Sequence, residues 1–258
     1  MKKQVNLNVN YKGVSAGERC LISLVEESGL AVFGVKEIAR LSGWNRRKIH
    51  NTFQSLESKG LALRVKRNAY ALKGVAEENA FRVAASAVTP SYLSFWSALS
   101  FYGFTEQQVS AIQLVSTRQE VELLLAGRRI QTTVFKPERF FGYKRVNGFN
   151  IAEREKAIVD SLFQPEKSGG LGEVAKCLKN SWGELNKPRF YRYLLKFKSK
   201  SLNSRVGFLL EKLSLANGKR MLLKNRSKGF VKLNPRFKKT SIYNKKWKII
   251  VNQKISGA

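Results

Sequence analysis

The sequence predicts an α+β protein, with an N-terminal winged helix-turn-helix followed by a mixed α/β C-terminal domain whose basic end is rich in helices and strands. The first part shows the order helix, helix, turn, helix, hairpin, and the rest mixes helical with strand-like patterns. Hydrophobic residues make up 43% of the 258 residues, which is enough for folded cores. The expected domains are residues 1–78 and 79–258, with a basic subregion at 186–258.

The first helix is predicted to begin at a capping box, in which Ser15 and Glu18 exchange hydrogen bonds with each other's backbone. Apolar residues then recur at helical spacing up to Gly29, a suitable residue for ending a helix. Cys20 lies in this apolar pattern and Cys177 in a similar one. Both are therefore expected to be buried free thiols.

A short second helix fits residues 35–41, with Ile38 and Leu41 turned inward. A short apolar connector, residues 30–33, precedes it. After the third helix, alternating apolar residues at 61–65 and 70–72 predict a small hairpin, the wing of the fold.

The third helix, residues 44–59, is the predicted recognition helix. Ile49, Phe53 and Leu56 form its buried stripe, while the other side offers Arg, Asn and Gln side chains of the kind that read base edges. A solvated polar face is the simpler alternative, and His50 fits either a groove contact or a surface position. The candidate DNA-binding residues are Trp44, Asn45, Arg46, Arg47, Lys48, His50, Asn51 and Gln54 on this helix, and Arg64, Lys66, Arg67 and Asn68 on the hairpin.

The middle of the chain is predicted to be mixed. One aromatic-rich helix is expected over residues 92–102, ending at Gly103. The other expected helices span 81–88, 152–163 and 171–178, and the expected strands span 111–116, 130–135 and 140–146.

The last 73 residues hold 21 basic residues and one acid, Glu211, so most of the net charge of +30 lies there. Helices are expected at 189–197 and 205–215, the latter capped by Gly218, and strands at 230–233 and 247–251. Basic side chains here are expected to contact the phosphate backbone beside the bases that are read. The candidates are Arg189, Arg192, Lys196, Lys198, Lys238, Lys239, Lys245 and Lys246.

The rare residues leave few options for catalysis or metal binding. A structural zinc site needs about four Cys or His ligands at short spacings, and the chain has two distant cysteines and one histidine. A Ser-His-Asp triad would have to use His50 and Asp160, and no Gly-x-Ser-x-Gly motif accompanies them. We therefore expect no enzyme activity, no cofactor and no metal.

The charge predicts a polyanionic partner, either nucleic acid or an acidic membrane surface. The longest mostly apolar run, residues 92–104, is too short to span a bilayer, and Lys2 and Lys3 are followed by polar, alternating residues that do not resemble a signal peptide. These patterns favour a cytoplasmic protein that binds DNA and no membrane.

Two stretches, residues 92–104 and 151–162, resemble the hallmark helices of AbiEi-type antitoxins, the regulatory halves of abortive-infection, type IV toxin–antitoxin pairs. Residues 246–252 are similar to the last strand of some members. The resemblance implies a repressor that binds inverted repeats near its own promoter and a nucleotidyltransferase-type toxin, countered without an obligatory tight complex. The strongly basic C-terminal end departs from the family. Lys156 and Asp160, four residues apart, are expected to form a modest ion pair.

The leading prediction is thus a sequence-specific DNA-binding transcriptional regulator, the autoregulating antitoxin of a toxin–antitoxin pair. One alternative is an interaction protein whose basic C-terminal domain neutralises an acidic protein toxin or binds RNA. A more remote alternative is a metal-dependent DNA-processing enzyme that uses Glu153, Glu155 and Lys156.

Overall fold

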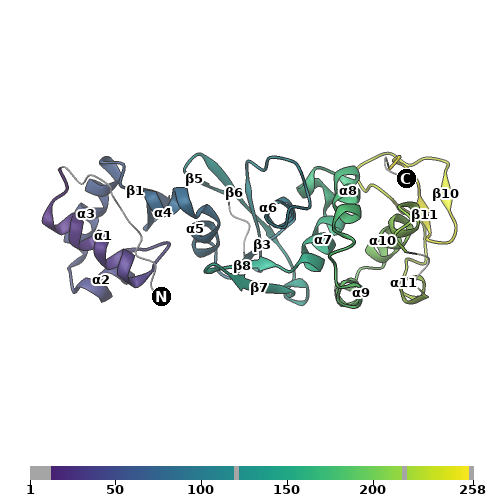
Figure 1. Ribbon diagram of the computed structural model, residues 1–258, viewed down its shortest axis with the longest axis horizontal. Coiled ribbons are helices and arrows are strands. Elements are labelled where there is room, and N and C mark those ends of the chain that lie inside the picture. Colours follow the sequence, from purple (N-terminus) through teal and green to yellow (C-terminus); the bar gives the residue numbers. More distant parts are fainter. Residues whose placement is uncertain (1–12, 119–121, 217–219, 256–258) are drawn as a thin grey trace. The chain divides into compact units, whose positions relative to one another are not determined.

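The computed structural model describes residues 13–118, 122–216 and 220–255, which form a mixed α+β structure (Figure 1). The chain divides into two compact units. The first runs to Ala87 and also takes in Leu125–Gly127, and the second comprises Val88–Leu124 and the residues from Arg128 onward. The sequence analysis placed its boundary after residue 78. Within the described residues, no helix combines the length and the hydrophobicity needed to cross a bilayer.

The first unit contains three helices, then an antiparallel hairpin, then two short helices. Phe33 forms an isolated bridge with Tyr70 of the hairpin, which ties the connector after the first helix to the hairpin. The elements are α1 (Ala16–Ser28), α2 (Val35–Ser42), α3 (Arg46–Ser58), β1 (Ala62–Lys66), β2 (Ala69–Leu72), α4 (Lys73–Glu78) and α5 (Ala80–Ala87).

The predicted capping box at the start of α1 is confirmed. The Glu18 N–H donates to Ser15 Oγ at 3.3 Å, and the Ser15 N–H donates to Glu18 Oε2 at 2.6 Å. Gly29 ends the helix with φ 65°, a conformation that costs glycine nothing. The prediction for Cys20 is wrong, because its side chain is exposed. It lies at the edge of the apolar stripe, and the core takes Leu21 instead.

Leu41 of α2 is also exposed, at 39%, although the sequence pattern placed it inward. The buried side of this two-turn helix is centred on Ile38, and Val35 and Ala39 pack beside it. Given about 100° per residue, Leu41 lies about 60° around the helix from Ile38, on the side away from Val35 and Ala39. The apolar stripe is therefore narrower than the pattern predicted.

The buried carboxylate of Glu18 joins the start of α1 to the end of α3. The Lys59 ammonium donates to both carboxylate oxygens at 2.8 Å, and the Ser55 hydroxyl also donates to the carboxylate. These hydrogen bonds, that of Lys59 foremost, lower the Glu18 pKa from 4.5 to about 2 although burial opposes the shift. The ionised form of Glu18 therefore stabilises the folded unit.

We expect Glu18→Gln to weaken the first unit by about 1–3 kcal/mol at neutral pH, because hydrogen bonds to a charged group are lost. The pKa is lower in the folded state, so the wild-type advantage is fully present above about pH 4.5 and disappears as the pH falls towards 2. Hydrogen exchange of α1 and α3 amides at neutral and acid pH measures this difference. Glu57→Gln, an exposed change on α3, is the control, and an equal effect of both variants would contradict the assignment.

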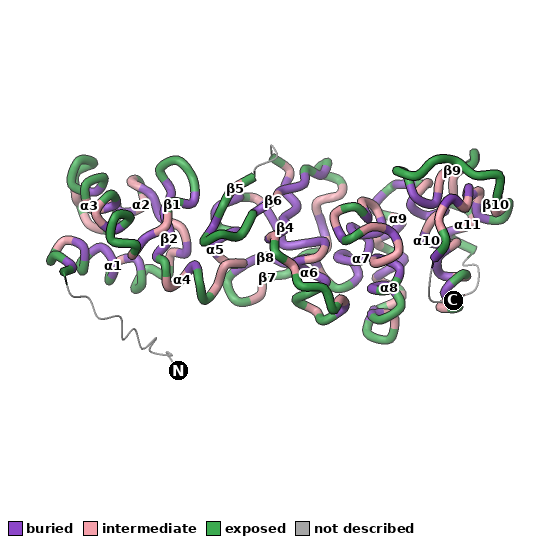
Figure 2. The backbone as a smooth tube through the Cα atoms, turned by 90° about the horizontal axis from the view of Figure 1, so that it is seen from above, coloured by how far each residue is buried: buried purple, intermediate pink, exposed green. Residues whose placement is uncertain are grey.

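The second unit is built on a six-stranded sheet with strand order β5-β6-β4-β3-β8-β7. β4 pairs in parallel with β6 and antiparallel with β3, and it is buried along its whole length (Figure 2). Its strands are β3 (Ser91–Leu93), β4 (Ile112–Ser116), β5 (Glu122–Leu125), β6 (Arg128–Val134), β7 (Tyr143–Val146) and β8 (Phe149–Ala152).

Helices and a second, three-stranded sheet complete this unit. The small sheet has the order β10-β11-β9 and lies in the basic subregion. The elements are α6 (Phe95–Phe101), α7 (Arg154–Phe163), α8 (Leu171–Ser181), α9 (Lys187–Lys196), α10 (Lys200–Lys212), α11 (Arg220–Lys224), β9 (Val231–Lys232), β10 (Tyr243–Asn244) and β11 (Ile249–Ile250), with 3₁₀ turns at Pro137–Arg139 and Pro165–Ser168.

The single helix predicted over residues 92–102 is wrong, because its first residues form strand β3 and only Phe95–Phe101 are helical. β3 pairs with a strand on each side and is wholly buried, so its residues do not alternate between apolar and polar. The predicted strand over 140–146 starts only at Tyr143, and β5 and β8 had no predicted counterparts. In the basic subregion α10 begins earlier than expected, at Lys200, where Ser199 caps it. The predicted cap Gly218 lies outside the described residues.

Candidate nucleic-acid interface

The turn between α2 and α3 fixes where the predicted recognition helix begins. Gly43 has φ 69° and its N–H donates to the Ala39 carbonyl, while the Trp44 N–H donates to Ser42 Oγ at 3.1 Å. Asn45 then caps the helix, because its Oδ1 accepts from the Lys48 N–H at 2.9 Å. The helix therefore starts at Arg46, two residues later than predicted.

The two faces of α3 differ as the sequence predicted. Ile49, Phe53 and Leu56 are no more than 1% exposed and pack into the core of the first unit. Within the described part of the chain, no carboxylate lies within ion-pair distance of the basic side chains on the other face. The exposed residues of this face are Arg46, Arg47, Lys48, His50, Asn51 and Gln54.

Trp44 and Asn45 have local structural roles that the sequence analysis did not assign. Trp44 is half-buried and packs against the hydrophobic core of the unit, and the Lys48 ammonium lies 3.9 Å from the centre of its ring. Asn45 uses its side-chain oxygen in the helix cap. Trp44 and Asn45 therefore help to build the start of α3.

The hairpin turn lies beside the first turn of α3. Arg46, His50 and Asn68 line one shallow depression of about 270 Å³, which also includes Gly34. Asn68 takes the turn with φ 57°, and its carbonyl lies where a Cβ on residue 34 would be only 2.5 Å away. Gly34 thus permits the hairpin to approach α2 closely.

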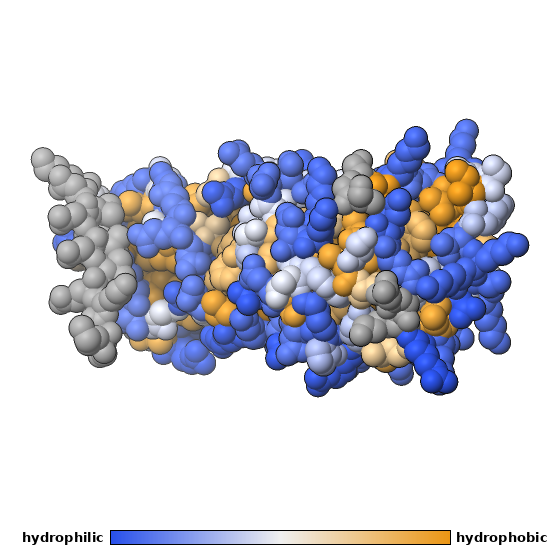
Figure 3. All heavy atoms as spheres, turned by 45° about the vertical axis from the view of Figure 1, so that its right-hand side comes forward, coloured by the Kyte–Doolittle hydropathy of each residue, from blue (hydrophilic) through white to orange (hydrophobic). Residues whose placement is uncertain are grey.

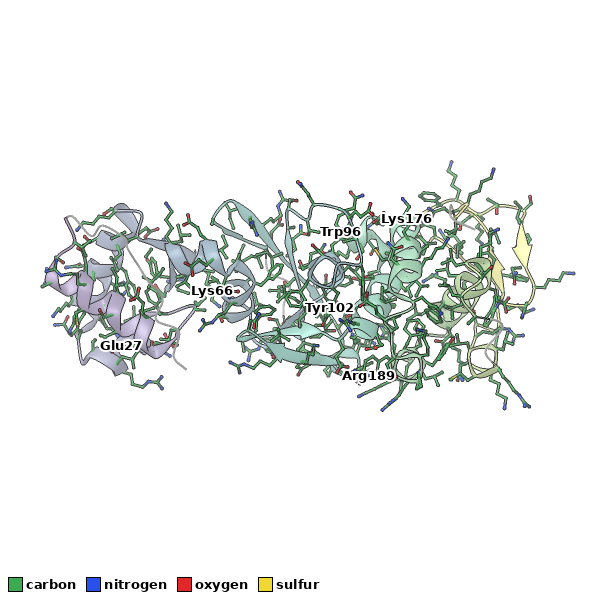
Figure 4. The ribbon with its side chains drawn as sticks, in the orientation of Figure 1. Glu27, Lys66, Trp96, Tyr102, Lys176 and Arg189 are labelled. Atoms are coloured by element: carbon green, nitrogen blue, oxygen red, sulfur yellow. The ribbon has the colours of Figure 1, made fainter. Side chains whose placement is uncertain are left out.

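The three basic side chains of the hairpin are not equivalent. Arg64 and Arg67 are exposed. The Lys66 ammonium donates to the Ala87 carbonyl at 2.6 Å, so it already has a partner at the end of α5 (Figure 4 labels Lys66). The sequence analysis names Lys66 as a candidate DNA contact and does not predict this hydrogen bond.

The basic subregion contains both free and paired cations. Arg189 lies 3.5 Å from a Glu153 oxygen and 3.7 Å from a Glu155 oxygen, and Lys246 forms an ion pair with Glu211 at 2.5 Å. These two predicted phosphate contacts are thus partly neutralised. Lys196 lies over the Phe141 ring at 4.4 Å. The others are exposed: Arg192, Lys198, Lys238, Lys239 and Lys245.

Exposed aromatic side chains stand among these lysines, and the sequence analysis missed them. Phe230, Phe237 and Tyr243 are 42%, 49% and 52% exposed. Phe230 and Tyr243 meet edge to face at 5.1 Å, and the Lys248 ammonium lies 5.1 Å from the Phe230 ring. Figure 3 shows hydrophobic atoms exposed between protruding hydrophilic side chains at its right, where these elements lie. We call Phe230, Phe237 and Tyr243 the aromatic patch.

The predicted ion pair between Lys156 and Asp160 forms, and it is completely buried. Both side chains are 0% exposed, and Asp160 also accepts from the Ser94 hydroxyl at 2.7 Å and the Tyr92 hydroxyl at 3.1 Å. Burial raises the Asp160 pKa and lowers the Lys156 pKa, and the attraction between the two opposes both shifts. Four aromatic rings lie 5.0–5.2 Å from the Lys156 ammonium: Tyr92, Phe135, Phe141 and Phe197.

Glu153 and Glu155, the candidate metal ligands of the remote alternative, have protein partners. The Tyr193 hydroxyl donates to Glu153, and the Asn186 N–H donates to Glu155 at 2.7 Å. Lys156 points to Asp160 instead of joining them. Among the described residues, no three His, Cys, Asp or Glu side chains converge on a point where a metal ion would fit.

Comparison with known proteins gives a fold relationship. No protein-family model matches the chain, and no protein with a curated description does either. The fold is similar to that of the Rv2827c protein from Mycobacterium tuberculosis. That crystal structure superposes with a TM-score of 0.62 and 13% sequence identity, covering 92% of this chain and 91% of the other. At such low identity the likeness shows the fold alone.

Proposed function

We propose that this protein is a sequence-specific DNA-binding transcriptional regulator whose first unit is a winged helix-turn-helix. The observation that carries the proposal is the outer face of α3, where six polar or basic side chains are exposed and no acid pairs with the cations in the described residues. Arg pairs with guanine edges, and Asn or Gln with adenine edges, in the major groove. The hairpin supplies Arg64 on β1 and Arg67 in its turn as backbone contacts.

The second unit supplies affinity through charge. Its exposed lysines and arginines in 186–258 contact phosphates outside the bases that are read. Each neutralised phosphate releases about one counterion, so binding weakens steeply with salt. Arg189 and Lys246 contribute less to this effect than the unpaired cations, because each already has a carboxylate partner.

The antitoxin role rests on the resemblance of residues 92–104 and 151–162 to AbiEi-type proteins. It implies an operator with inverted repeats and a nucleotidyltransferase-type toxin as functional partner in the cytoplasm. Co-expression with a toxin encoded beside the gene tests this role, since growth should recover. Unchanged toxicity would contradict the antitoxin role. The proposal of DNA binding would then depend only on the binding measurements described next.

We expect Arg47→Ala to lower affinity for the specific site by about 1–3 kcal/mol, because a guanine contact would be lost. The measurement compares binding to the DNA upstream of the gene with binding to scrambled DNA of the same composition. The variant should lose more affinity for the upstream DNA than for the scrambled DNA, so that the ratio of the two affinities falls. Lys73→Ala, an exposed change in the same unit away from α3, is the control. Equal wild-type affinities for both DNAs at moderate salt would contradict a specific regulator.

A second candidate function is binding of unpaired nucleic acid by the basic subregion, which the aromatic patch favours. In proteins that bind single strands, unpaired bases stack on exposed aromatic rings and the phosphates pair with neighbouring basic side chains. The aromatic patch and the lysines around it offer both kinds of contact. An acidic protein toxin would also suit the lysines but would not need the exposed rings. A stoichiometric partner that co-purifies after nuclease treatment would favour that protein instead.

We expect Tyr243→Ala to weaken binding of a single-stranded oligonucleotide by about 1–3 kcal/mol, the usual value of one stacked base. Tyr243→Phe keeps the ring and should bind like the wild type. Fluorescence anisotropy with single-stranded and duplex probes of the same length separates the two modes. An equal loss for both probes would show that the patch does not select unpaired bases.

A further inference from the structure

The basic subregion contains a loop whose backbone is tied to one buried side chain. We call residues 234–239 the basic loop. Asn234 is buried, whereas residues 235–239 are exposed, in the green stretch between β9 and β10 of Figure 2. Asn252, two residues after the end of β11, is 8% exposed. The basic loop and Asn252 both belong to the second unit.

The Asn252 side chain hydrogen-bonds to the loop backbone with both of its polar atoms. Its Oδ1 accepts from the Asn234 N–H at 2.9 Å. Its Nδ2 donates to the carbonyls of Asn234, Phe237 and Lys238, at 2.8, 3.2 and 3.1 Å. Because the Asn234 N–H can only donate, the atom that faces it must be the amide oxygen. One amide group thus holds both ends of the turn that the loop makes.

Asparagine suits this position because it donates and accepts at the same time. Aspartate would place a carboxylate oxygen against three carbonyl oxygens, and leucine would leave these buried groups without a partner. Two more contacts support the loop. Asn234 Nδ2 donates to Gln253 Oε1 at 2.7 Å, and the Lys232 ammonium donates to the Phe237 carbonyl at 3.0 Å. The loop backbone is therefore fixed by contacts within the protein.

The basic loop presents an aromatic ring and unpaired cations to solvent. Phe237 is 49% exposed, and Lys238 and Lys239 are exposed beside it. Within the part of the chain that the structure describes, neither lysine lies within ion-pair distance of a carboxylate. A ring that stacks on a base and cations that pair with phosphates are the two contacts that bind single-stranded nucleic acid.

The other two rings of the aromatic patch are attached to the strands that flank β11. Tyr243 lies in β10, and Phe230 directly precedes β9. Both strands pair with β11, which is buried. Asn252, just after β11, supports the third ring, that of Phe237, through the loop. All three rings are thus carried by backbone that is bonded to one buried segment, residues 249–252.

We infer that the basic loop is a preformed binding element for unpaired nucleic acid, and that Asn252 is the residue that positions it. Phe237 stacks on a base while Lys238 and Lys239 pair with neighbouring phosphates. A preformed loop loses less conformational entropy on binding, so Asn252 raises the affinity without touching the ligand. This inference rests on the second candidate function above and assigns the residue that organises its site.

Asn252→Ala tests the positioning role, because it removes the support of the loop without removing a charge. We expect the single-stranded probe to bind at least about fivefold more weakly, since about one stacked base is lost. The slope of log affinity against log salt should become shallower by up to about 1.4, about 0.7 for each of two phosphates that are no longer paired.

Asn225→Ala is the matched control and should change neither quantity. It removes another asparagine of the basic subregion, whose side chain donates to the Met221 carbonyl at 2.9 Å. Unchanged affinity of Asn252→Ala would overturn the positioning role. A weaker affinity with an unchanged salt slope would overturn it too, because the lysines would then still reach their phosphates.

A double-mutant cycle shows whether Asn252 acts through the loop. The triple variant Phe237→Ala, Lys238→Ala, Lys239→Ala changes only exposed side chains and should weaken binding at least as much as Asn252→Ala. Adding Asn252→Ala to the triple variant should cost less than about a further twofold, because the groups that Asn252 positions are already gone. Losses that add up in full would overturn the inference.

Photo-cross-linking of the wild-type chain does not depend on the folding of any variant. A single-stranded oligonucleotide that contains iodouracil should form adducts with both Phe237 and Tyr243. Adducts at Tyr243 without any at Phe237 would overturn the role of the loop and leave the second candidate function in place. Failure of the wild type to bind the oligonucleotide at all would overturn both.

Discussion

Replacing Lys156 with methionine is expected to destabilise the second unit by about 3–5 kcal/mol, the usual cost of leaving one member of a buried ion pair without its partner. Asp160 would keep its Ser94 and Tyr92 hydrogen bonds but lose the cation that balances its charge. Asp160→Asn should cost a similar amount, because the Lys156 ammonium would remain among four aromatic rings. Urea unfolding followed by tryptophan fluorescence measures the change, since three of the four tryptophans lie in the second unit.

The double variant Lys156→Met, Asp160→Leu separates the pair from its surroundings. It removes both charges and should be less destabilised than the sum of the two single variants, because no uncompensated buried charge remains. The exposed pair Lys73 and Glu77 is the matched control, and Lys73→Met should cost less than about 1 kcal/mol. Single variants at Lys156 and Asp160 that cost no more than this control would contradict the structural role.

Replacing Gly207 with alanine is expected to loosen the whole basic end of the second unit. A Cβ at this position in α10 would lie 2.1 Å from the ring of Trp247, which is fully buried, so helix and ring would have to move apart. Overpacking of this kind costs about 1–3 kcal/mol or more. Hydrogen exchange should become faster in β9, β10 and β11 and stay unchanged in α1 and α3.

Gly229→Ala is the control, because nothing lies within 4 Å of the Cβ it would add. If Gly207→Ala also weakens nucleic-acid binding while Gly229→Ala does not, the basic side chains need the packing of Trp247 against α10 in order to bind nucleic acid. Trp247 has a second contact with α10, since its indole N–H donates to Glu211 at 2.8 Å. Glu211 is the one acid in residues 186–258, and its role there is structural.

The parts of the fold that depend on local sequence were predictable. The capping box, the stripe of Ile49, Phe53 and Leu56 and the hairpin all rest on residues within about 15 positions of one another. The candidate interface was predictable from the same pattern. Once the buried stripe of α3 is known, the residues on the opposite side of the helix must be exposed. The partner of Lys66 was not predictable, since Ala87 is 21 residues away.

Long-range packing decided the remaining differences. Tyr92 lies in a strand because β3 pairs with β4 on one side and with β8 on the other, which no short window of sequence reveals. The spacing of Lys156 and Asp160 predicted their contact but not their burial, which the sheet and the surrounding aromatic rings impose. In residues 230–248 aromatic residues occur among lysines, which is a pattern that could have predicted the aromatic patch. The sequence analysis interpreted parts of this run only as strands.

The two cysteines have different surroundings. Because of this difference, a thiol-reactive dye can label one of them selectively without any substitution in the chain. Cys20 is exposed on the first unit, whereas burial raises the pKa of the Cys177 thiol to about 11, so little of its reactive thiolate exists at neutral pH. A maleimide dye should therefore report from the unit that carries α3. Changes in its signal on adding DNA or salt would follow that unit in the otherwise unaltered protein.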